Sequence, residues 1–227
     1  MGNFTPLVAI VDYGLGNLFS VEQACALVGL NSIITNSKKD IIAADAVILP
    51  GVGAYGDAML TLHRLDLVNV LRDIADAPKP LVGICLGLQL LMTESYEFGH
   101  HKGLGIIEGP VVRFEAPKEK ERILKVPQIG WNRIFQPTDG LRWYGALLDG
   151  IDEGEYMYFV HSYTIQPQES NVILSTSRYG QIEFCSSIQH HNVFACQFHP
   201  ERSGVKGMKV YHNLAALLQT VAQGGTT

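Results

Sequence analysis

Short apolar runs alternate with amphipathic segments through the first half of the chain. Valine- and isoleucine-rich runs predict buried β-strands at residues 7–11, 32–35, 45–49 and 80–82. Helical periodicity follows at residues 18–28, 57–75 and 88–92. Strands that alternate with helices are typical of an open sheet flanked by helices. We therefore expect an α/β fold.

The pattern changes after residue 98. Glycines and short alternating runs replace the helical periodicity up to about residue 180 and predict β-hairpins laid over the sheet. The charged segment 116–122 is expected to be a solvated loop, and residues 156–163 are expected to form a strand. A strand at 193–198 and a helix at 204–221 complete a single predicted domain of residues 1–222, and we expect residues 223–227 to be disordered.

The composition limits the classes of function. A chain of 227 residues with 47% hydrophobic residues and a net charge of −5 is typical of a soluble globular protein. Because it offers no electrostatic attraction to nucleic acid or to an anionic membrane, we expect neither as a partner. The chain shows neither a basic secretory signal nor the roughly 20 apolar residues of a bilayer span, which indicates a cytoplasmic location.

The four cysteines are widely spaced and form no CxxC pair. This spacing indicates neither a disulfide framework nor a zinc site. The glycine-rich turn at residues 12–17 contains one Gly-x-Gly pair and no following lysine, so a phosphate-binding loop is a poor interpretation. We expect no cofactor and no metal ion.

Cys85 lies at the centre of residues 83–87 (Gly-Ile-Cys-Leu-Gly), between a predicted strand and a predicted helix. Glycines two residues before and after the cysteine let the backbone reverse direction without Cβ clashes, as in a nucleophile elbow. Unpaired N–H groups at the start of the helix favour a thiolate, and the N–H of Leu86 would point at a developing oxyanion. A buried, inert cysteine in an ordinary turn fits this segment equally well.

Two further positions could share a pocket with this thiol. Residues 50–53 (Pro-Gly-Val-Gly) follow a predicted strand and can turn N–H groups toward an anion, although a tight turn without a ligand fits at least as well. Gln89 lies four residues after Cys85, so both side chains project from the same helix face. Gln89 is either a substrate contact or a solvated side chain.

His199, Pro200 and Glu201 follow the last predicted strand. Because Pro200 favours an extended backbone, His199 and Glu201 can turn toward the same site. A carboxylate bound to one imidazole nitrogen leaves the other nitrogen free to take a thiol proton and return it to a leaving amine. Without a nearby nucleophile, the two residues would be interpreted as unrelated. His161, taken alone, is interpreted as a hydrogen-bonded structural histidine.

Residues 83–91 and 197–201 together resemble the class I, triad-type glutamine amidotransferases. Residues 12–17, 50–53, 126–132 and 159–163 further resemble the glutaminase subunits of imidazole glycerol phosphate synthase, and the likeness spans nearly the whole chain. The resemblance implies an enzyme that releases ammonia from glutamine. It also implies a separate (β/α)8 cyclase partner, which uses the ammonia to make imidazole glycerol phosphate and AICAR in histidine biosynthesis.

The same resemblance implies roles for individual residues. The catalytic triad would be Cys85, His199 and Glu201. The oxyanion would lie near the backbone amides of Val52 and Leu86. Glutamine would be held by Gly51, Gly53, Gln89, Glu97, Ser162 and Tyr163. The cyclase interface would include Asn17 and Trp131, although periodicity alone assigns Trp131 to the core.

Several alternatives remain open. Gln128 stands where this family often has histidine, and residues 184–186 (Phe-Cys-Ser) resemble paralogues that supply ammonia to amidated cell-surface sugars. A cysteine peptidase or stress-response protein on a related scaffold would often carry histidine directly after the cysteine, where this chain has Leu86. A non-enzymatic binding module would not require His199 and Glu201 to meet Cys85.

Overall fold

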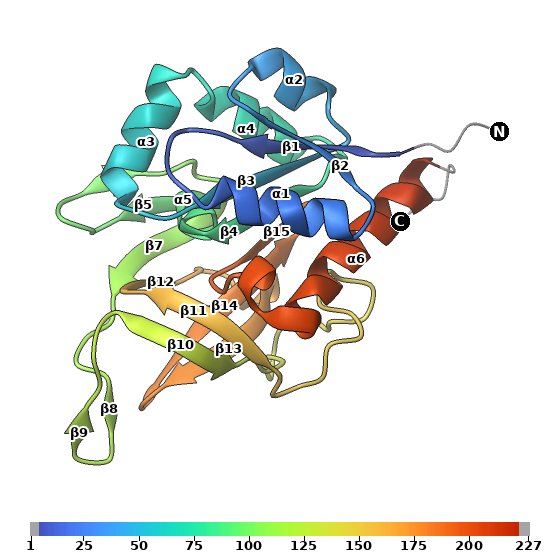
Figure 1. The fold of residues 1–227 in the computed structure, drawn as a ribbon. Coiled ribbons are helices and arrows are strands. Elements are labelled where there is room, and N and C mark those ends of the chain that lie inside the picture. The colour runs from blue at the N-terminus through green and yellow to red at the C-terminus, as the bar shows by residue number, and fades with distance from the viewer. Residues whose placement is uncertain (1–4, 223–227) are drawn as a thin grey trace.

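Among the described residues, a mixed sheet of eleven strands with helices on both faces forms the body of the molecule (Figure 1). The computed structural model describes residues 5–222. The predicted α/β sheet flanked by helices is confirmed. The tail expected at residues 223–227 lies outside the described residues, and the domain boundary at residue 222 stays a prediction.

One half of the sheet is parallel. In spatial order its strands are β2 (Asn31–Thr35), β1 (Leu7–Val11), β3 (Ala46–Gly51), β4 (Leu81–Cys85) and β15 (Val193–Cys196). The inner strands are buried on both faces, which explains their continuous apolar sequences. At one edge of the sheet Gly51 pairs with Cys85, and Cys196 pairs with Ile84. The carboxyl ends of β3, β4 and β15 therefore meet.

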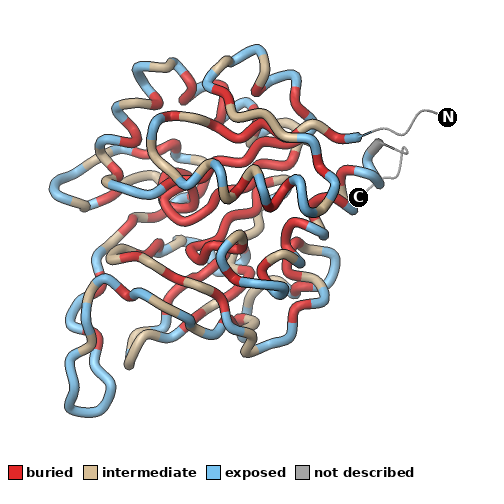
Figure 2. Tube along the Cα trace, in the orientation of Figure 1, coloured by how far each residue is buried: buried red, intermediate tan, exposed pale blue. Residues whose placement is uncertain are grey.

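The helices cover both faces of the sheet. On one face lie α1 (Leu18–Leu27) and α6 (Gly204–Ala222); on the other lie α2 (Lys38–Ala43), α3 (Tyr55–Arg64), α4 (Val68–Asp76) and α5 (Leu86–Leu90). Each set packs on its own hydrophobic cluster, and Figure 2 shows the buried strands between them. In α4, for example, Val68, Leu71 and Ile74 are spaced three residues apart on one helix face, and all three are buried. None of the described helices combines the length and apolar character that crossing a membrane requires.

The other half of the sheet is largely antiparallel. Beyond β15 it continues with β14 (Ile182–His190), β12 (Tyr163–Ile165), β7 (Ile107–Arg113), β5 (Met92–Ser95) and β6 (His101–Lys102), while β13 (Ile173–Tyr179) also pairs with β14. Two separate pairs are β10 (Gln128–Arg133) with β11 (Tyr156–His161), and β8 (Lys118–Glu119) with β9 (Arg122–Ile123). Two 3-10 helices, η1 (Ser170–Val172) and η2 (Pro200–Arg202), lie in the connections. Most of the predicted hairpins thus extend the sheet instead of covering it.

Several local predictions are wrong. The single helix expected at residues 57–75 is two helices, α3 and α4, because Asp66 adopts a φ of 54° between them. Aspartate tolerates this left-handed backbone, and apolar periodicity continues across the break and hides it. The charged segment 116–122 is not only a loop, since it carries β8 and part of β9. Helix α2 was not predicted.

Strand ends account for the other differences. The helix after Cys85 ends at Leu90 and not at Met92, because residues 92–95 form β5 and pair with β7. The strand expected at residues 156–163 ends at His161, and Tyr163 begins β12, which pairs with β7 instead. Pairing with a neighbouring strand decides these boundaries, and periodicity does not report it.

Candidate active site

Cys85 ends β4 and directly precedes α5, with φ 56° and ψ −105°. A positive φ is unfavourable for a residue with a Cβ, and such strain is typical of nucleophile elbows. The flanking glycines provide space: a Cβ at Gly87 would lie 1.8 Å from the carbonyl oxygen of Leu49, and one at Gly83 would lie 2.9 Å from Cβ of Ala195. This geometry favours the elbow over an ordinary turn.

His199 and Glu201 lie just beyond the end of β15, next to β4. Nδ1 of His199 lies 2.7 Å from Oε1 of Glu201, and the two side chains are only 5% and 1% exposed. Three hydrogen bonds fix the backbone of His199. Its N–H donates to the carbonyl oxygen of Tyr158 (2.9 Å), and its own carbonyl accepts from Oγ of Ser203 (2.6 Å) and from the N–H of Arg202 (3.0 Å). The prediction that this histidine and glutamate face one another is confirmed.

The imidazole of His199 is coupled to both Cys85 and Glu201. Burial alone would lower the pKa of His199, but its interactions with Cys85 and Glu201 outweigh burial and raise the pKa to about 10. Its Nε2 is buried and has no hydrogen-bond partner of ordinary geometry among the described residues. Nε2 is therefore free to exchange a proton with the neighbouring sulfur.

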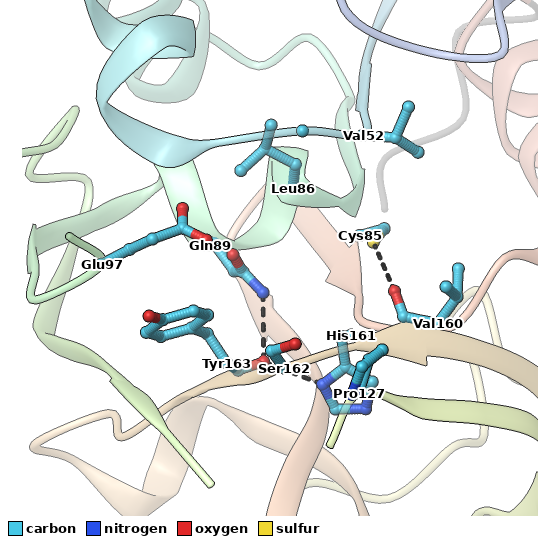
Figure 3. Close-up of a pocket in the computed structure, with 11 residues that line it drawn as sticks. Val52, Cys85, Leu86, Gln89, Glu97, Pro127, Val160, His161, Ser162 and Tyr163 are labelled. Carbon is cyan, nitrogen blue, oxygen red and sulfur yellow. Dashed lines mark hydrogen bonds between the residues drawn. The ribbon is translucent and has the colours of Figure 1, made fainter. Parts of the chain in front are cut away.

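A cavity of about 260 Å3 opens above the sulfur of Cys85 (Figure 3). Val52 and Gly53 contribute one wall from the loop after β3, and Leu86 contributes another from the start of α5. The remaining lining residues are Gln89, Glu97, Pro127, Val160, His161, Ser162 and Tyr163. The cavity thus collects most of the residues predicted to hold substrate or oxyanion.

Gly51 does not line this cavity and has a packing role. A Cβ at Gly51 would lie 2.0 Å from the hydroxyl oxygen of Tyr13 and 3.0 Å from Cβ of Leu86. The loop that follows β3 can approach Cys85 only because this position has no side chain. The substrate contact predicted for Gly51 finds no support in its position.

Glu97 and Gln89 lie close together in Figure 3, apart from Cys85. Oε2 of Glu97 accepts a hydrogen bond from the backbone N–H of Tyr55 at the start of α3 (2.5 Å), and its carboxylate borders the cavity. Gln89 is only 6% exposed, and its Nε2 donates to the carbonyl oxygen of Tyr163 (3.2 Å). Gln89 shares a face with Cys85, as predicted, but it is held by hydrogen bonds and is not solvated.

Asn17 and Trp131 lie outside the cavity. Asn17 caps α1, where its side chain accepts from the N–H of Ser20 (3.4 Å). The core position that periodicity gave for Trp131 is wrong, because its side chain is 57% exposed. Its ring packs edge-on against Tyr158, with 6.1 Å between the centroids. β10 and β11 form a separate two-stranded sheet, and the face that carries Trp131 is left uncovered.

Sequence reasoning missed two residues beside the thiol. The hydroxyl of Tyr13 donates to the carbonyl oxygen of Pro50 (2.6 Å), near the end of β3 and just before the loop that borders the cavity. Nε2 of Gln197 lies 3.5 Å from Sγ of Cys85. The signal for Gln197 was present: it lies two residues before His199, so in an extended segment both side chains point the same way. Tyr13 had no comparable signal in the sequence.

The four cysteines, Cys25, Cys85, Cys185 and Cys196, are buried and free of disulfides. Within residues 5–222, no three His, Cys, Asp or Glu side chains are grouped so that they could hold a metal ion. Nucleophilic chemistry at the thiol, with the imidazole as acid and base, is what this arrangement of side chains can perform.

Residues 9–216 match the model of the family "Glutamine amidotransferase class-I". The chain is 43% identical to "Imidazole glycerol phosphate synthase subunit HisH" of Aquifex aeolicus (strain VF5), over 90% of this chain and 93% of that one. It is 44% identical to the protein of the same name from Moorella thermoacetica, over 96% of this chain and 98% of that one. The chain belongs to the HisH family of class-I glutamine amidotransferases.

Solved structures agree with this HisH-family fold. PurLQS from Thermotoga maritima matches with a TM-score of 0.70 at 19% identity, over 95% of this chain and 100% of that chain. The glutaminase domain of CTPS from Trypanosoma brucei matches with a TM-score of 0.63 at 14% identity, over 98% of this chain and 96% of that chain. At these identities the likeness concerns the fold alone.

The two departures from the HisH pattern lie in the packed interior. Gln128 is buried, with Oε1 3.1 Å from Nε2 of His161, whose Nδ1 lies 2.8 Å from the carbonyl oxygen of Tyr163. Burial lowers the pKa of His161 to about 4. The prediction that His161 is hydrogen-bonded is confirmed, and its purely structural role stays a prediction. Residues 184–186 are buried in β14 and do not border the cavity. Neither Gln128 nor residues 184–186 border the cavity.

Proposed function

We propose that this chain is the glutaminase subunit of imidazole glycerol phosphate synthase, which releases ammonia from glutamine for a cyclase subunit in histidine biosynthesis. The observation that carries the proposal is the strained Cys85 beside a buried His199–Glu201 pair in a member of the HisH family. A binding module would need neither the strain nor the coupled imidazole. The proposal places the enzyme in the cytoplasm, as a single domain of residues 1–222.

The reaction proposed for these residues has two halves. The thiol proton of Cys85 passes to Nε2 of His199, and the sulfur attacks the side-chain amide carbon of glutamine. His199 then gives the proton to the departing nitrogen, so the carbon–nitrogen bond breaks and ammonia leaves. In the second half, His199 takes a proton from water, which hydrolyses the thioester to glutamate and restores the thiol. Glu201 holds the imidazole in the required tautomer throughout.

Each half passes through an oxyanion, for which we propose the backbone N–H groups of Val52 and Leu86 as donors. Both residues border the cavity next to Cys85. In comparable acyl-transfer chemistry, loss of one such donor costs about 3–4 kcal/mol. The backbone orientation of the loop after β3 therefore matters as much as a catalytic side chain does.

For the amino-acid end of glutamine we propose Glu97, Gln89, Ser162 and Tyr163, with Gly53 allowing close approach. The carboxylate of Glu97 would face the α-ammonium group, because opposite charges attract most strongly where water is excluded. Since Nε2 of Gln89 is already bonded, its Oε1 is the atom available to a ligand. This assignment leaves the side-chain amide of glutamine pointing at Cys85.

The partner we propose is a (β/α)8 cyclase subunit that forms a heterodimer with this chain and receives the ammonia. Its docking face would include Asn17 and the exposed Trp131. The backbone N–H of His199 donates to the carbonyl oxygen of Tyr158, and the Tyr158 ring packs against Trp131. A partner that binds this face would therefore influence the position of the catalytic histidine. Supply of ammonia to a cell-surface sugar is the rival assignment, and it predicts a different partner.

The test combines glutamate release with partner binding. Wild-type and Cys85→Ala chains are mixed with the histidine-pathway cyclase or with a surface-sugar amidating partner, each with its acceptor substrate. We expect the histidine-pathway cyclase to bind both chains and to stimulate glutamate release only from the wild type. Undiminished release by Cys85→Ala would remove the mechanism, and stimulation by the other partner alone would reassign the acceptor.

A further inference from the structure

Gln197 is completely buried beneath the cavity, with its side-chain amide between Gln89 and Cys85. Its Nε2 lies 3.5 Å from Sγ of Cys85, and its Oε1 lies 3.0 Å from Nε2 of Gln89. Nε2 of Gln89 also donates to the carbonyl oxygen of Tyr163 (3.2 Å), a hydrogen bond drawn as a dashed line in Figure 3. The two amides form a continuous chain of hydrogen bonds from Tyr163 to the sulfur.

The carbonyl oxygen of Tyr163 fixes which group donates in each of these hydrogen bonds. A backbone carbonyl can only accept, so the part of Gln89 that faces Tyr163 must be its NH2 group. The same nitrogen faces Gln197, which must therefore present its carbonyl oxygen to Gln89 and its own NH2 group to Cys85. Turning the Gln197 amide over would set two NH2 groups against each other. A donor is thus aimed at the sulfur.

We propose that Gln197 is a positioning residue that stabilises the thiolate of Cys85 by donating a hydrogen bond from Nε2 to Sγ. A hydrogen bond donated to the charged form of an acid favours that form, and it is stronger than one between neutral groups. The thiol proton passes to Nε2 of His199, and Gln197 keeps both of its own protons. The inference rests on the proposed role of Cys85 as the nucleophile.

The carbonyl oxygen of Val160 acts on the sulfur in the opposite sense. It lies 3.8 Å from Sγ and accepts from the neutral thiol, so it disfavours the loss of the proton. Gln197 donates a side-chain N–H to this sulfur, and the imidazole of His199 also interacts with it. The balance between thiol and thiolate therefore depends on the Gln197 amide as well as on the imidazole.

The titratable groups that face the sulfur come from three segments. Tyr13 approaches from the loop after β1, Cys196 from β15, and His199, backed by Glu201, from the segment after β15. Burial raises the pKa of Tyr13 and of Cys196 well above their usual values, so both stay neutral. Repulsion from a Cys85 thiolate adds to both shifts, and repulsion from Glu201 adds to that of Cys196. The charge that forms on Cys85 is met by His199 and by the neutral donor Gln197.

The test measures the alkylation of Cys85 by iodoacetamide against pH, without glutamine, with the modified site identified by mass spectrometry. Gln197→Met preserves the volume and removes the donor. We expect the pH of half-maximal rate to rise by about one unit, which is about tenfold less thiolate at a pH below the midpoint. Gln197→Glu turns a carboxylate toward the sulfur and should raise the midpoint further.

A second position keeps the test decisive if Gln197→Met does not fold. Gln89→Met leaves Gln197 in place but removes the partner that fixes its amide, so a smaller rise is expected. The matched control is Gln189→Met, which loses a hydrogen bond from Nε2 to the carbonyl oxygen of His191 (2.7 Å) at the far end of β14 and should leave the midpoint unchanged.

The outcomes separate this inference from the proposed function. A wild-type midpoint in Gln197→Met, or in Gln89→Met where the former does not fold, overturns the role of Gln197. Alkylation requires no glutamine, so a folded wild type without glutaminase activity would overturn the proposed function and leave the midpoint shifts standing. Raised midpoints together with glutamine hydrolysis by the wild type support both.

Discussion

Tyr13 carries no chemistry in the proposed reaction, yet it holds the loop that borders the thiol. Its hydroxyl donates to the carbonyl oxygen of Pro50 (2.6 Å), and its ring end occupies the space that a side chain at Gly51 would need. Burial raises the pKa of Tyr13 far above its usual value, so the hydroxyl stays protonated and remains a donor. With the Pro50 carbonyl fixed, the following peptides reach Val52 in a defined orientation.

The variant Tyr13→Phe removes this hydroxyl and keeps the ring. We expect kcat for glutamine hydrolysis to fall by about 10-fold to 100-fold with little change in KM, since the loss of a whole oxyanion donor costs about 100-fold to 1000-fold. Stability should fall by about 1 kcal/mol, the usual contribution of a buried hydrogen bond. Steady-state kinetics with the partner present and a urea titration measure the two effects.

Tyr55→Phe is the matched control. The hydroxyl of Tyr55 is equally buried but has no hydrogen-bond partner among the described residues, so its removal should change neither kcat nor stability appreciably. Equal losses of kcat in the two variants, or an effect of Tyr13→Phe confined to stability, would show that the hydroxyl does not position the loop.

Residues whose partners lie nearby in the sequence were predictable, and the others were not. The spacing of His199 and Glu201 was sufficient to place them together, because an extended backbone returns to the same face after two residues. Tyr13 meets Pro50 across 37 positions, and only the parallel pairing of β1 with β3 brings the two together. A single sequence holds no local record of that pairing.

At the scale of elements, the buried parallel strands were the clearest feature of the sequence. Because helices cover both faces of β1, β3 and β4, each strand must be apolar throughout, and such runs are visible without a structure. Elements whose ends depend on tertiary pairing were misplaced, as β5 illustrates: it pairs with β7 and begins at Met92, the last residue of the helix predicted at residues 88–92. Periodicity reports burial, and burial alone does not decide between helix and strand at a boundary.

The close contact between α5 and β3 predicts that Gly87→Ala lowers stability, although helix propensity favours alanine. Helix propensity predicts that Gly87→Ala stabilises the protein by about 0.5–1 kcal/mol. The added Cβ would instead lie 1.8 Å from the Leu49 carbonyl oxygen, so α5 has to move away from β3. We expect a destabilisation of about 2–3 kcal/mol, as in other overpacked cores, and a Tm lower by about 4–12 °C.

Gly56→Ala in α3 is the comparison for this prediction. Its Cβ would meet the ring of His101 at 2.7 Å, and a partly exposed side chain can move where a backbone carbonyl cannot. A Tm within about 3 °C of wild type is expected for Gly56→Ala, since the free energy of unfolding should change by less than about 1 kcal/mol. If calorimetry gave Gly87→Ala the higher Tm of the two, the close approach of α5 to β3 would not be what requires glycine.

At the scale of the whole molecule, the cavity and the exposed β10–β11 pair are two parts of one arrangement. The carbonyl oxygen of Tyr158 on β11 accepts the backbone hydrogen bond of His199. The Tyr158 ring contacts both Trp131 and the guanidinium of Arg202, which lies 4.9 Å from the ring centroid. His199, the proposed acid and base, is therefore one residue away from an uncovered aromatic surface. A partner bound there could change activity by small movements of β11.

Trp131→Ala tests whether this surface is the docking face. An exposed tryptophan at the centre of an interface commonly contributes about 2 kcal/mol, so Kd for the cyclase should rise about 30-fold, while glutamine hydrolysis without partner stays unchanged. Tyr144→Ala removes an aromatic side chain that is 90% exposed elsewhere and should leave Kd unaltered. Calorimetric titration of the cyclase into each variant measures the difference. Equal affinities for wild type and Trp131→Ala would place the partner on another face. The contact between Trp131 and Tyr158 would then not link partner binding to His199.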